Sequence, residues 1–228
     1  VGGREYGTQR DLITYNHLPP QVLQPTARLK VVAFDLATNG INVGYLPGAG
    51  DSLPDNLNNM GYNVQILDDG KLTADDLKNL DAVILGVRAL NVRKEMGKAM
   101  PILLDYVEKG GTLIVQYNRP DNLQAPKFAP YDLTISPGRV TDERAAITFL
   151  DPQNQIFNSP NKITDKDFDG WVQERGLYFP NKWDEHFTPL IACNDKGEDP
   201  LKGALLVAKY GKGTYIYTGL AFFRQLPA

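Results

Sequence analysis

The densest group of reactive side chains is the stretch 165–179, in which carboxylates alternate with aromatic residues. Sugar-binding clefts use this combination, because aromatic rings stack on the apolar faces of sugars while carboxylates bind sugar hydroxyls. Asp169 and Glu174 would serve as the acid and base of a glycosidase if they faced one bond from opposite sides. The stretch therefore points to a glycan ligand, with Trp171, Glu174 and Arg175 as candidate ligand-binding residues.

The same stretch also has a structural interpretation. In it, Trp171 and Tyr178 are core residues, while the acids and Arg175 form ion pairs that fix a loop. Spacing along the chain does not fix the distance between the carboxyl groups of Asp169 and Glu174. Both interpretations therefore stay open, with these two acids as the only catalytic alternative.

Polar residues also follow three apolar runs that are typical of buried strands: Asp51, then Arg88 with Asn91, then Asn118. In an open α/β sheet, ligands bind in the crevice beyond the carboxyl ends of the strands. An arginine there could bind a carboxylate or phosphate through two hydrogen bonds, or equally pin a neighbouring loop. The turn before Asp51 lacks the glycine spacing and the lysine of a phosphate loop, which favours a plain tight turn.

Nucleophilic and metal chemistry are not indicated by the sequence. It contains no Gly-x-Ser-x-Gly elbow, and Cys193 ends an apolar run that is typical of a small buried residue. His17 and His186 are the only histidines, and no His or Cys spacing is typical of a metal site. We therefore expect neither a metal nor another cofactor.

Composition excludes several classes of partner. The chain has 228 residues, 42% of them hydrophobic and 22% charged, which is ordinary for a globular protein with a sizeable core. The formal net charge of -3 gives no general attraction to nucleic acid. No apolar run approaches the ~20 residues that span a bilayer. We therefore expect no nucleic-acid or membrane partner, while one cysteine leaves the redox compartment open.

From Ile41 onward, short apolar runs alternate with helical patterns, which implies a parallel sheet with right-handed crossovers. Helices are expected at 53–60, around Leu77 and at 100–108, the first two from capping-box spacing at Ser52 and Thr73 and the last with Pro101 in its first turn. The expected strands are 41–46, 62–67, 81–86, 112–117, 131–135, 145–150, 171–179, 189–193, 204–210 and 213–218. The last two strands form a predicted β-hairpin, and a helix begins within 222–226.

The first forty residues differ from the rest. Residues 15–21 are Pro-rich and aperiodic, and 29–36 is typical of one strand. A lone strand must either join the edge of the following sheet or end an upstream domain. We expect residues 1–40 to be an extended linker or the end of an upstream domain. Residues 41–228 are expected to form a three-layer α/β domain, with a mostly parallel sheet flanked by helices.

Two segments, 105–115 and 209–218, together with the order of strands and helices, resemble the class I glutamine amidotransferase-like fold, including its ThuA-like branch. The resemblance implies a flavodoxin-like domain. Class I amidotransferases place a catalytic cysteine at the elbow after the third core strand, with His and Glu partners. The matching segment here is Gly86-Val87-Arg88-Ala89, so the nucleophile is absent.

Four segments resemble the C-terminal region of large bacterial PIG-L (LmbE-like) deacetylases: 44–51, 86–89, 160–164 and 167–180. This resemblance spans roughly residues 15–228 and implies an upstream deacetylase domain in the same polypeptide. It favours a periplasmic or secreted location, which the residues themselves leave open. The zinc-binding motif of these deacetylases has no match here, so no catalytic position is carried over.

We therefore expect a non-catalytic amidotransferase-like accessory module of a PIG-L-type deacetylase, which binds carbohydrate or packs on the catalytic domain. One alternative is a carboxylate-dependent hydrolase that acts on a glycan through Asp169 and Glu174. Another is a purely structural or oligomerisation domain. The candidate ligand-binding residues are Asp51, Arg88, Asn91, Asn118, Trp171, Glu174 and Arg175.

Overall fold

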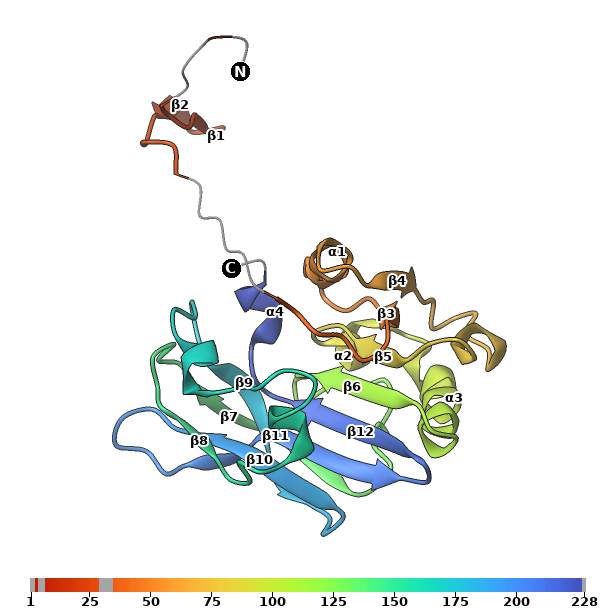
Figure 1. Ribbon diagram of the computed structural model, residues 1–228. Helices are drawn as coiled ribbons and strands as arrows, with labels where there is room; N and C mark the ends of the chain where they lie inside the picture. The colour runs from red at the N-terminus through yellow and green to blue at the C-terminus, as the bar shows by residue number, and fades with distance from the viewer. Residues whose placement is uncertain (1–2, 4–6, 29–34, 227–228) are drawn as a thin grey trace. The chain divides into compact units, whose positions relative to one another are not determined.

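The structure is a computed structural model that describes residues 3, 7–28 and 35–226 (Figure 1). The chain divides into two compact units, Val1–Leu36 and Ala37–Ala228.

The first unit contains a β-hairpin of β1 (Asp11–Tyr15) and β2 (Leu18–Leu23), paired antiparallel. The prediction that residues 15–21 are aperiodic is wrong, because they include the end of β1 and the first residues of β2. The two prolines of β2 can sit in this hairpin because both strands are edge strands, where a missing N–H donor is tolerated. The predicted strand 29–36 falls largely on residues 29–34, which lie outside the described residues.

The second unit is built on an eight-stranded sheet, which confirms the predicted α/β architecture. Four neighbouring pairs, from the first strand to the fifth, are parallel, and the remaining three pairs are antiparallel. The predicted hairpin around Gly211 is confirmed as the pair of β11 and β12. The strand order is β4 (Asn63–Ile66), β3 (Asn42–Leu46), β5 (Ala82–Leu85), β6 (Thr112–Gln116), β12 (Gly213–Thr218), β11 (Leu201–Tyr210), β10 (Phe187–Cys193) and β8 (Ile147–Phe149).

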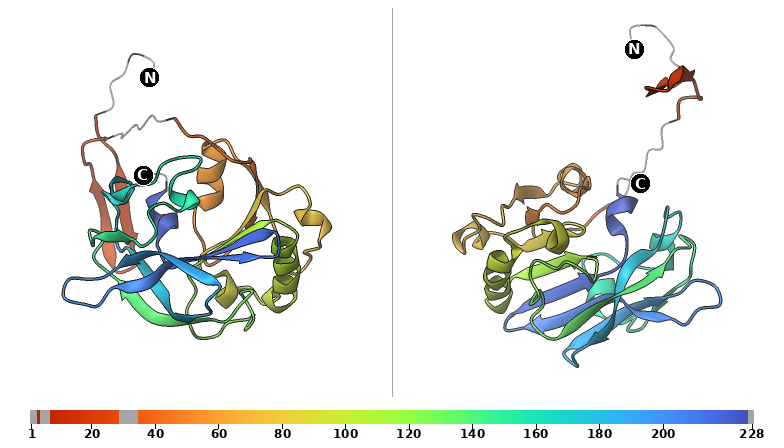
Figure 2. Two further views of the ribbon diagram at one scale, coloured as in Figure 1. Left: turned by 60° about the horizontal axis from the view of Figure 1, so that its bottom comes forward. Right: turned by 180° about the vertical axis from the view of Figure 1, so that it is seen from behind.

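The long helix α3 (Met96–Glu108) packs on one face of this sheet, against β6 and β12 (Figures 1 and 2). It begins four residues before the predicted start, so Pro101 lies inside the helix rather than in its first turn. The earlier start is explained by Met96, which is fully buried and continues the apolar stripe of Met100, Leu103 and Val107.

The other helices are short: α1 (Leu53–Asn59), α2 (Ala89–Val92) and α4 (Phe222–Gln225). The predicted cap at Ser52 is wrong, because its side chain makes no capping bond, whereas Asp51 Oδ1 accepts a hydrogen bond from Leu53 N at 3.0 Å. Asp76 does bond back to the backbone N–H and hydroxyl of Thr73, but only the 3₁₀ turn η1 (Asp75–Leu77) follows.

The region between β6 and β10 is less regular and holds a second small sheet of β7 (Leu133–Val140) and β9 (Gly176–Trp183). The predicted strand 171–179 is wrong in its first half, because positive φ angles at Gly170 and Gln173 interrupt an extended backbone before Gly176. Two further 3₁₀ turns, η2 (Gln155–Phe157) and η3 (Asp165–Phe168), lie in this region.

Side chains alternate between the two faces of the central sheet, so each face has its own apolar cluster. The α3 face holds the largest cluster, which includes Leu85, Leu113, Val115, Tyr215 and Tyr217. On the opposite face, α1 packs over Val43, Tyr45 and Ile84, while aromatic residues of the 157–171 segment pack over β10 and β11. The opposite face is thus covered from its two sides by different segments.

Candidate functional site

Arg88 occupies the turn that follows β5 and adopts a left-handed conformation, with φ 59° and ψ 21°. Its backbone N–H donates to Tyr117 O at 2.9 Å, which ties this turn to the end of β6. Its Nε is buried and has no hydrogen-bond partner among the described residues. Arg88 therefore stands at the predicted crevice with part of its guanidinium unused.

Asp51 lies in the loop between β3 and α1, and its carboxylate holds this loop in place. Its Oδ1 accepts hydrogen bonds from the Tyr45 hydroxyl at 2.7 Å and from Leu53 N. Burial, followed by the bond to Asp51, raises the pKa of Tyr45 well above its ordinary value. Gly86 carries no Cβ, which leaves room for the Tyr45 hydroxyl beside it. The Asp51 Oδ2 atom is buried without a partner in the described part of the chain.

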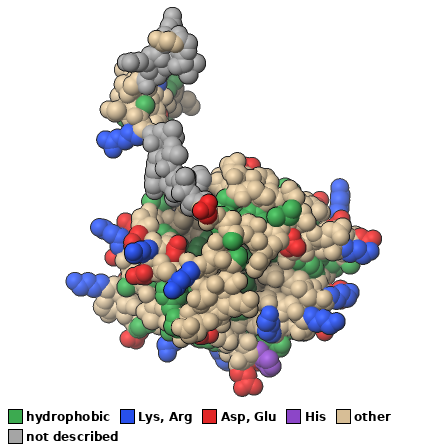
Figure 3. Space-filling model, viewed as in Figure 1, with side chains coloured by type: hydrophobic (Ala, Val, Ile, Leu, Met, Phe, Trp, Pro, Cys, Tyr) green, Lys and Arg blue, Asp and Glu red, His purple; other side chains and the backbone are tan. Residues whose placement is uncertain are grey.

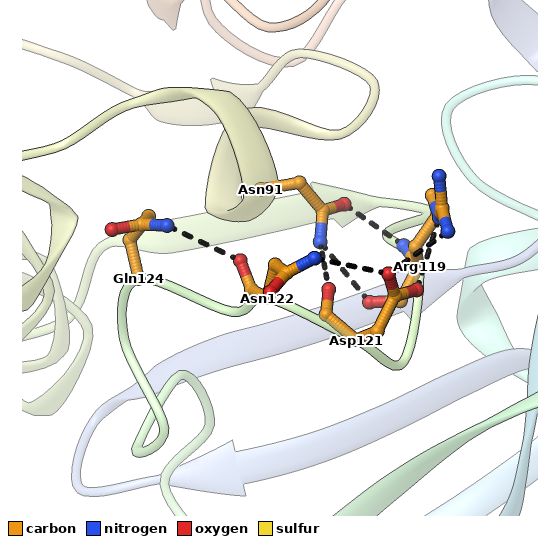
Figure 4. A network of polar contacts seen from close by, with 5 residues as sticks. All are labelled: Asn91, Arg119, Asp121, Asn122 and Gln124. Atoms are coloured by element: carbon orange, nitrogen blue, oxygen red, sulfur yellow. Dashed lines mark hydrogen bonds and ion pairs between the residues drawn. The ribbon is translucent and has the colours of Figure 1, made fainter.

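Asn91 and Asn118 hold the loops after β5 and β6 together. Figure 4 shows the Asn91 amide between Arg119 and Asp121: Nδ2 donates to both carbonyl oxygens, and Oδ1 accepts from Arg119 N at 2.9 Å. Asn118 is completely buried, accepts from Leu90 N at 2.9 Å and donates to Gln116 O at 2.8 Å. Both side chains are thus engaged by the chain's own backbone.

Trp171 and Arg175 belong to a different part of the molecule, the apolar cluster over β10 and β11. The Trp171 side chain is buried and donates to Asp167 O at 3.0 Å. The Arg175 guanidinium lies near the Trp171 ring, 5.4 Å from its centroid, and donates to Ala145 O at 2.8 Å and to Phe168 O. Burial lowers the pKa of Arg175. Trp171 is thus a buried residue, as the structural interpretation expects, whereas the ion pair expected of Arg175 is replaced by hydrogen bonds to backbone carbonyls.

Glu174 pairs with Arg224 on α4, with 2.8 Å between Oε1 and Nε. Burial raises the pKa of the nearby Tyr117, and the charge of Arg224 opposes that shift. The Tyr117 ring packs edge-on against Tyr178 and Phe223. Tyr117 accepts the backbone hydrogen bond of Arg88 and lies near Arg224, which pairs with Glu174. Arg88 and Glu174 are therefore connected through these two residues. Asp169 caps the end of η3 and is exposed, and its use with Glu174 as a catalytic pair stays a prediction.

Burial raises the pKa of the Cys193 thiol to about 12. No group of three or more His, Cys, Asp or Glu residues that could hold a metal occurs within residues 3, 7–28 and 35–226. Over that same part of the chain, no helix has both the length and the apolar character to cross a bilayer. On the face seen in Figure 3, acidic and basic side chains are interspersed.

An apolar groove lies on the sheet face opposite α3, between α1 and the 157–171 segment. We call it the open-face groove. Its cavity of about 540 Å³ is floored by β5, β6 and β12, and it is lined also by Leu53 of α1 and by Phe222 and Gln225 of α4. α1 packs over Ile84, whereas Ile114 and Ile216 stay half-buried. Its apolar lining residues are Leu53, Ile84, Ile114, Ile156, Phe157, Ile163, Phe168, Trp171, Ile191, Leu205, Ile216, Phe222 and Leu226.

The floor of the open-face groove is a row of three isoleucines in register. Ile84 of β5 is opposite Ile114 of β6, which in turn is opposite Ile216 of β12. The next row toward the carboxyl ends pairs Gln116 with Thr218. Sequence reasoning did not find this site, although apolar residues at successive positions of these strands predicted a sheet buried on both faces. Of the predicted ligand residues, only Trp171 lines the groove.

No family model matches the sequence, and no curated protein matches it. Among solved structures, the cytoplasmic protein STM3548 from Salmonella typhimurium is similar, with a TM-score of 0.50 and 11% identity over 92% of this chain and 82% of that chain. A GMP synthase subunit from Thermoplasma acidophilum also has a TM-score of 0.50 and 11% identity, over 82% of this chain and 90% of that chain. At this identity the likeness concerns the fold alone. This chain therefore has a three-layer α/β fold of the class I glutamine amidotransferase-like kind.

Proposed function

We propose that this chain is a non-catalytic amidotransferase-like accessory module whose open-face groove packs against another domain. The observation that carries the proposal is the apolar floor of the groove, in which Ile114 and Ile216 stay half-buried beside Ile84, over which α1 packs. Parallel sheets are almost always covered on both faces, because their strands are apolar on both sides. A contiguous uncovered apolar surface on a sheet typically marks an interface or a binding groove.

The residue at the turn after β5 supports the non-catalytic part of the proposal. Class I amidotransferases, which the sequence resembles, carry their nucleophile there, whereas this chain has Arg88 in a left-handed conformation. A guanidinium stays protonated and cannot act as a nucleophile at ordinary pH. The turn after β5 thus carries an arginine side chain, which is suited to binding an anion or to holding a loop in place.

The hairpin of the first unit provides a second apolar surface. Five of its large apolar side chains are about half exposed, namely Leu12, Tyr15, Leu18, Val22 and Leu23. An isolated two-stranded hairpin is marginally stable in water, so such a hairpin gains stability by packing on a partner. This favours a chain that works within a larger assembly.

For the partner, we propose the catalytic domain of a PIG-L-type deacetylase, which rests on the sequence resemblance alone. The test measures binding between this chain and that domain by calorimetry. Replacement of the half-buried Ile216 by Lys should weaken binding at least ~10-fold, because a charge would be buried in an apolar contact. Ile66→Lys is the matched control, since Ile66 is 58% exposed on β4, outside the groove. Equal affinity for all three proteins would contradict the proposal.

Carbohydrate binding is the second candidate function, and the unused Nε of Arg88 is the observation that favours it. A saccharide at the sheet top would raise the melting temperature by mass action. A thermal-shift screen with amino sugars and N-acetylated sugars, repeated on Arg88→Ala, tests this. A saturable shift that disappears in Arg88→Ala would support it, while a flat screen of the folded protein leaves packing as the function.

A further inference from the structure

We propose that the open-face groove binds a neutral, largely apolar small molecule that donates one O–H or N–H hydrogen bond to Gln116 Oε1. Such a ligand goes beyond the proposed packing function, because it would lie inside the cavity of the groove, whereas a packed domain would cover its rim. Three features of the cavity support this ligand: its enclosure, its apolar lining, and one buried acceptor without a partner.

The cavity is enclosed on several sides. Residues of α1, of α4 and of the 157–171 segment line it above the floor of β5, β6 and β12. Ala37 exchanges two hydrogen bonds with the Asn161 side chain, at 3.1 Å through Ala37 N and at 2.8 Å through Ala37 O, and residues 37–41 then lead to β3 (Figure 1). These residues therefore connect the 157–171 segment to the α1 side of the groove. A volume of about 540 Å³ in such surroundings lies within the range of roughly 300–1,000 Å³ that is typical of small-molecule sites.

The lining of the cavity is apolar and largely buried. Phe157, Phe168 and Leu205 line it and are buried, while Ile114 and Ile216 of the floor stay half-buried. An apolar molecule that covers these side chains gains free energy, because it removes apolar surface from water. We therefore expect the ligand to be apolar over most of its surface.

Gln116 places a hydrogen-bond acceptor without a partner at this cavity. The residue lines the cavity and is only 3% exposed. Its Nε2 donates to Leu85 O at 3.4 Å, so the other end of the amide is the acceptor Oε1, which is buried and has no hydrogen-bond partner among the described residues. A buried acceptor without a partner is unfavourable, and a ligand that donates to it removes this penalty.

The position of Gln116 sets the orientation of the ligand. Gln116 is opposite Thr218, and both follow the row of Ile114 and Ile216 toward the carboxyl ends of the strands. Open α/β sheets bind their ligands near these ends. The donor group of the ligand therefore lies toward the carboxyl ends, and its apolar body lies over the two isoleucines.

The remaining polar groups of the lining favour a neutral ligand. The Thr218 hydroxyl and both ends of the Gln225 amide already bond to the backbone. Asp167 alone is charged among the described residues that line the cavity, and it is exposed, with its Oδ2 accepting from the backbone N–H and hydroxyl of Thr164. A charged ligand would thus lose its hydration without gaining a buried counter-charge.

Three matched probes test the ligand by NMR on the chain with labelled isoleucine methyl groups. 2-Naphthol donates an O–H bond, 2-methylnaphthalene has nearly the same shape without a donor, and 2-naphthoate is charged. 2-Naphthol should give saturable shifts at Ile84, Ile114 and Ile216 and none at Ile66, which lies on β4 outside the cavity. It should bind ~5-fold more tightly than 2-methylnaphthalene, because it gains one hydrogen bond. 2-Naphthoate should give no saturable shift.

The parent chain alone can overturn the ligand. Absence of saturable shifts at the three cavity isoleucines with 2-naphthol would show that the cavity takes no such molecule. Equal affinity for 2-naphthol and 2-methylnaphthalene would show that Gln116 Oε1 accepts no bond from a ligand. Saturable binding of 2-naphthoate at the same isoleucines would contradict the neutral class.

A substitution of Gln116 assigns the acceptor. Gln116→Met keeps an unbranched side chain of similar length and removes Oε1, so it should abolish the preference for 2-naphthol while 2-methylnaphthalene still binds. Gln65→Met is the matched control, since Gln65 is exposed on β4 outside the cavity, and it should keep the preference. A preference that survives Gln116→Met would overturn the assignment. The comparison of probes on the parent chain holds even where Gln116→Met does not fold.

Calorimetry with the catalytic domain separates this ligand from the proposed packing function. If Ile216→Lys weakens domain binding while no probe binds, packing at the groove stands and the ligand is wrong. If 2-naphthol binds with the expected preference while Ile216→Lys leaves domain binding unchanged, the cavity holds a ligand and the proposed packing is wrong.

Discussion

The carboxylate of Glu174 lies 2.8 Å from Arg224 Nε and so fastens α4 to the segment that precedes β9. Both side chains are less than one-third exposed, at 13% and 31%. The residue that the sequence suggested as a sugar ligand, or as one member of a catalytic acid–base pair, thus has a partner fifty positions away in the chain.

Replacement of Glu174 by Gln should lower the free energy of unfolding by about 1 kcal/mol, because the Arg224 guanidinium loses its paired charge in a partly buried place. Hydrogen exchange should quicken in α4. Asp169→Asn is the control, since Asp169 is exposed and forms no ion pair among the described residues. Glycan hydrolysis by the parent chain that both substitutions abolish would instead support the hydrolase alternative.

Asn118→Ala should cost about 2–3 kcal/mol in the free energy of unfolding, because it leaves Leu90 N and Gln116 O buried without partners. Asn91→Ala, in a less buried place, should cost about 1 kcal/mol, since water can replace part of its bonds. Urea denaturation measures both. If Asn118→Ala were as stable as the parent chain, the amide of Asn118 would not be what holds the two loops together.

Cys193 should make stability fall as pH rises above 9. The thiol pKa is raised from 9.0 to about 12 by burial, so between these values the unfolded chain loses a proton that the folded chain keeps. By linkage, this contribution is fully present below pH 9 and is lost progressively toward pH 12. Urea denaturation as a function of pH, compared with Cys193→Ala, isolates it, and equal slopes for the two proteins would contradict it.

The sequence predicted the parallel half of the sheet well, because its strands are continuous apolar runs separated by helices or turns. It did not predict the β1–β2 hairpin, since Pro19 and Pro20 obscure strand periodicity. It also did not predict how α3 extends back to Met96. Local patterns define elements, whereas these boundaries depend on packing with distant residues.

The candidate site was predicted only in part. Asp51, Arg88, Asn91 and Asn118 do follow strands at the top of the sheet, as the runs before them indicated. Their roles could not be predicted, because hydrogen bonds such as that between Leu90 N and Asn118 Oδ1 join residues far apart in the chain. The open-face groove was missed for a related reason: apolar strands indicate that both faces need cover, and they do not say which face lacks it.

Substitutions of Arg88 test whether the stability of the turn after β5 depends on the left-handed backbone at this position or on the guanidinium group. A left-handed residue other than glycine is unfavourable by about 1–2 kcal/mol, and a β-branched residue fits there worst. Arg88→Gly should therefore stay within about 1 kcal/mol of the parent chain, while Arg88→Val should be less stable than Arg88→Gly by about 1–2 kcal/mol. Thermal unfolding measures both. If Arg88→Gly were instead destabilised as much as Arg88→Val, the guanidinium itself would hold the loop, and its free Nε would be no evidence for a ligand.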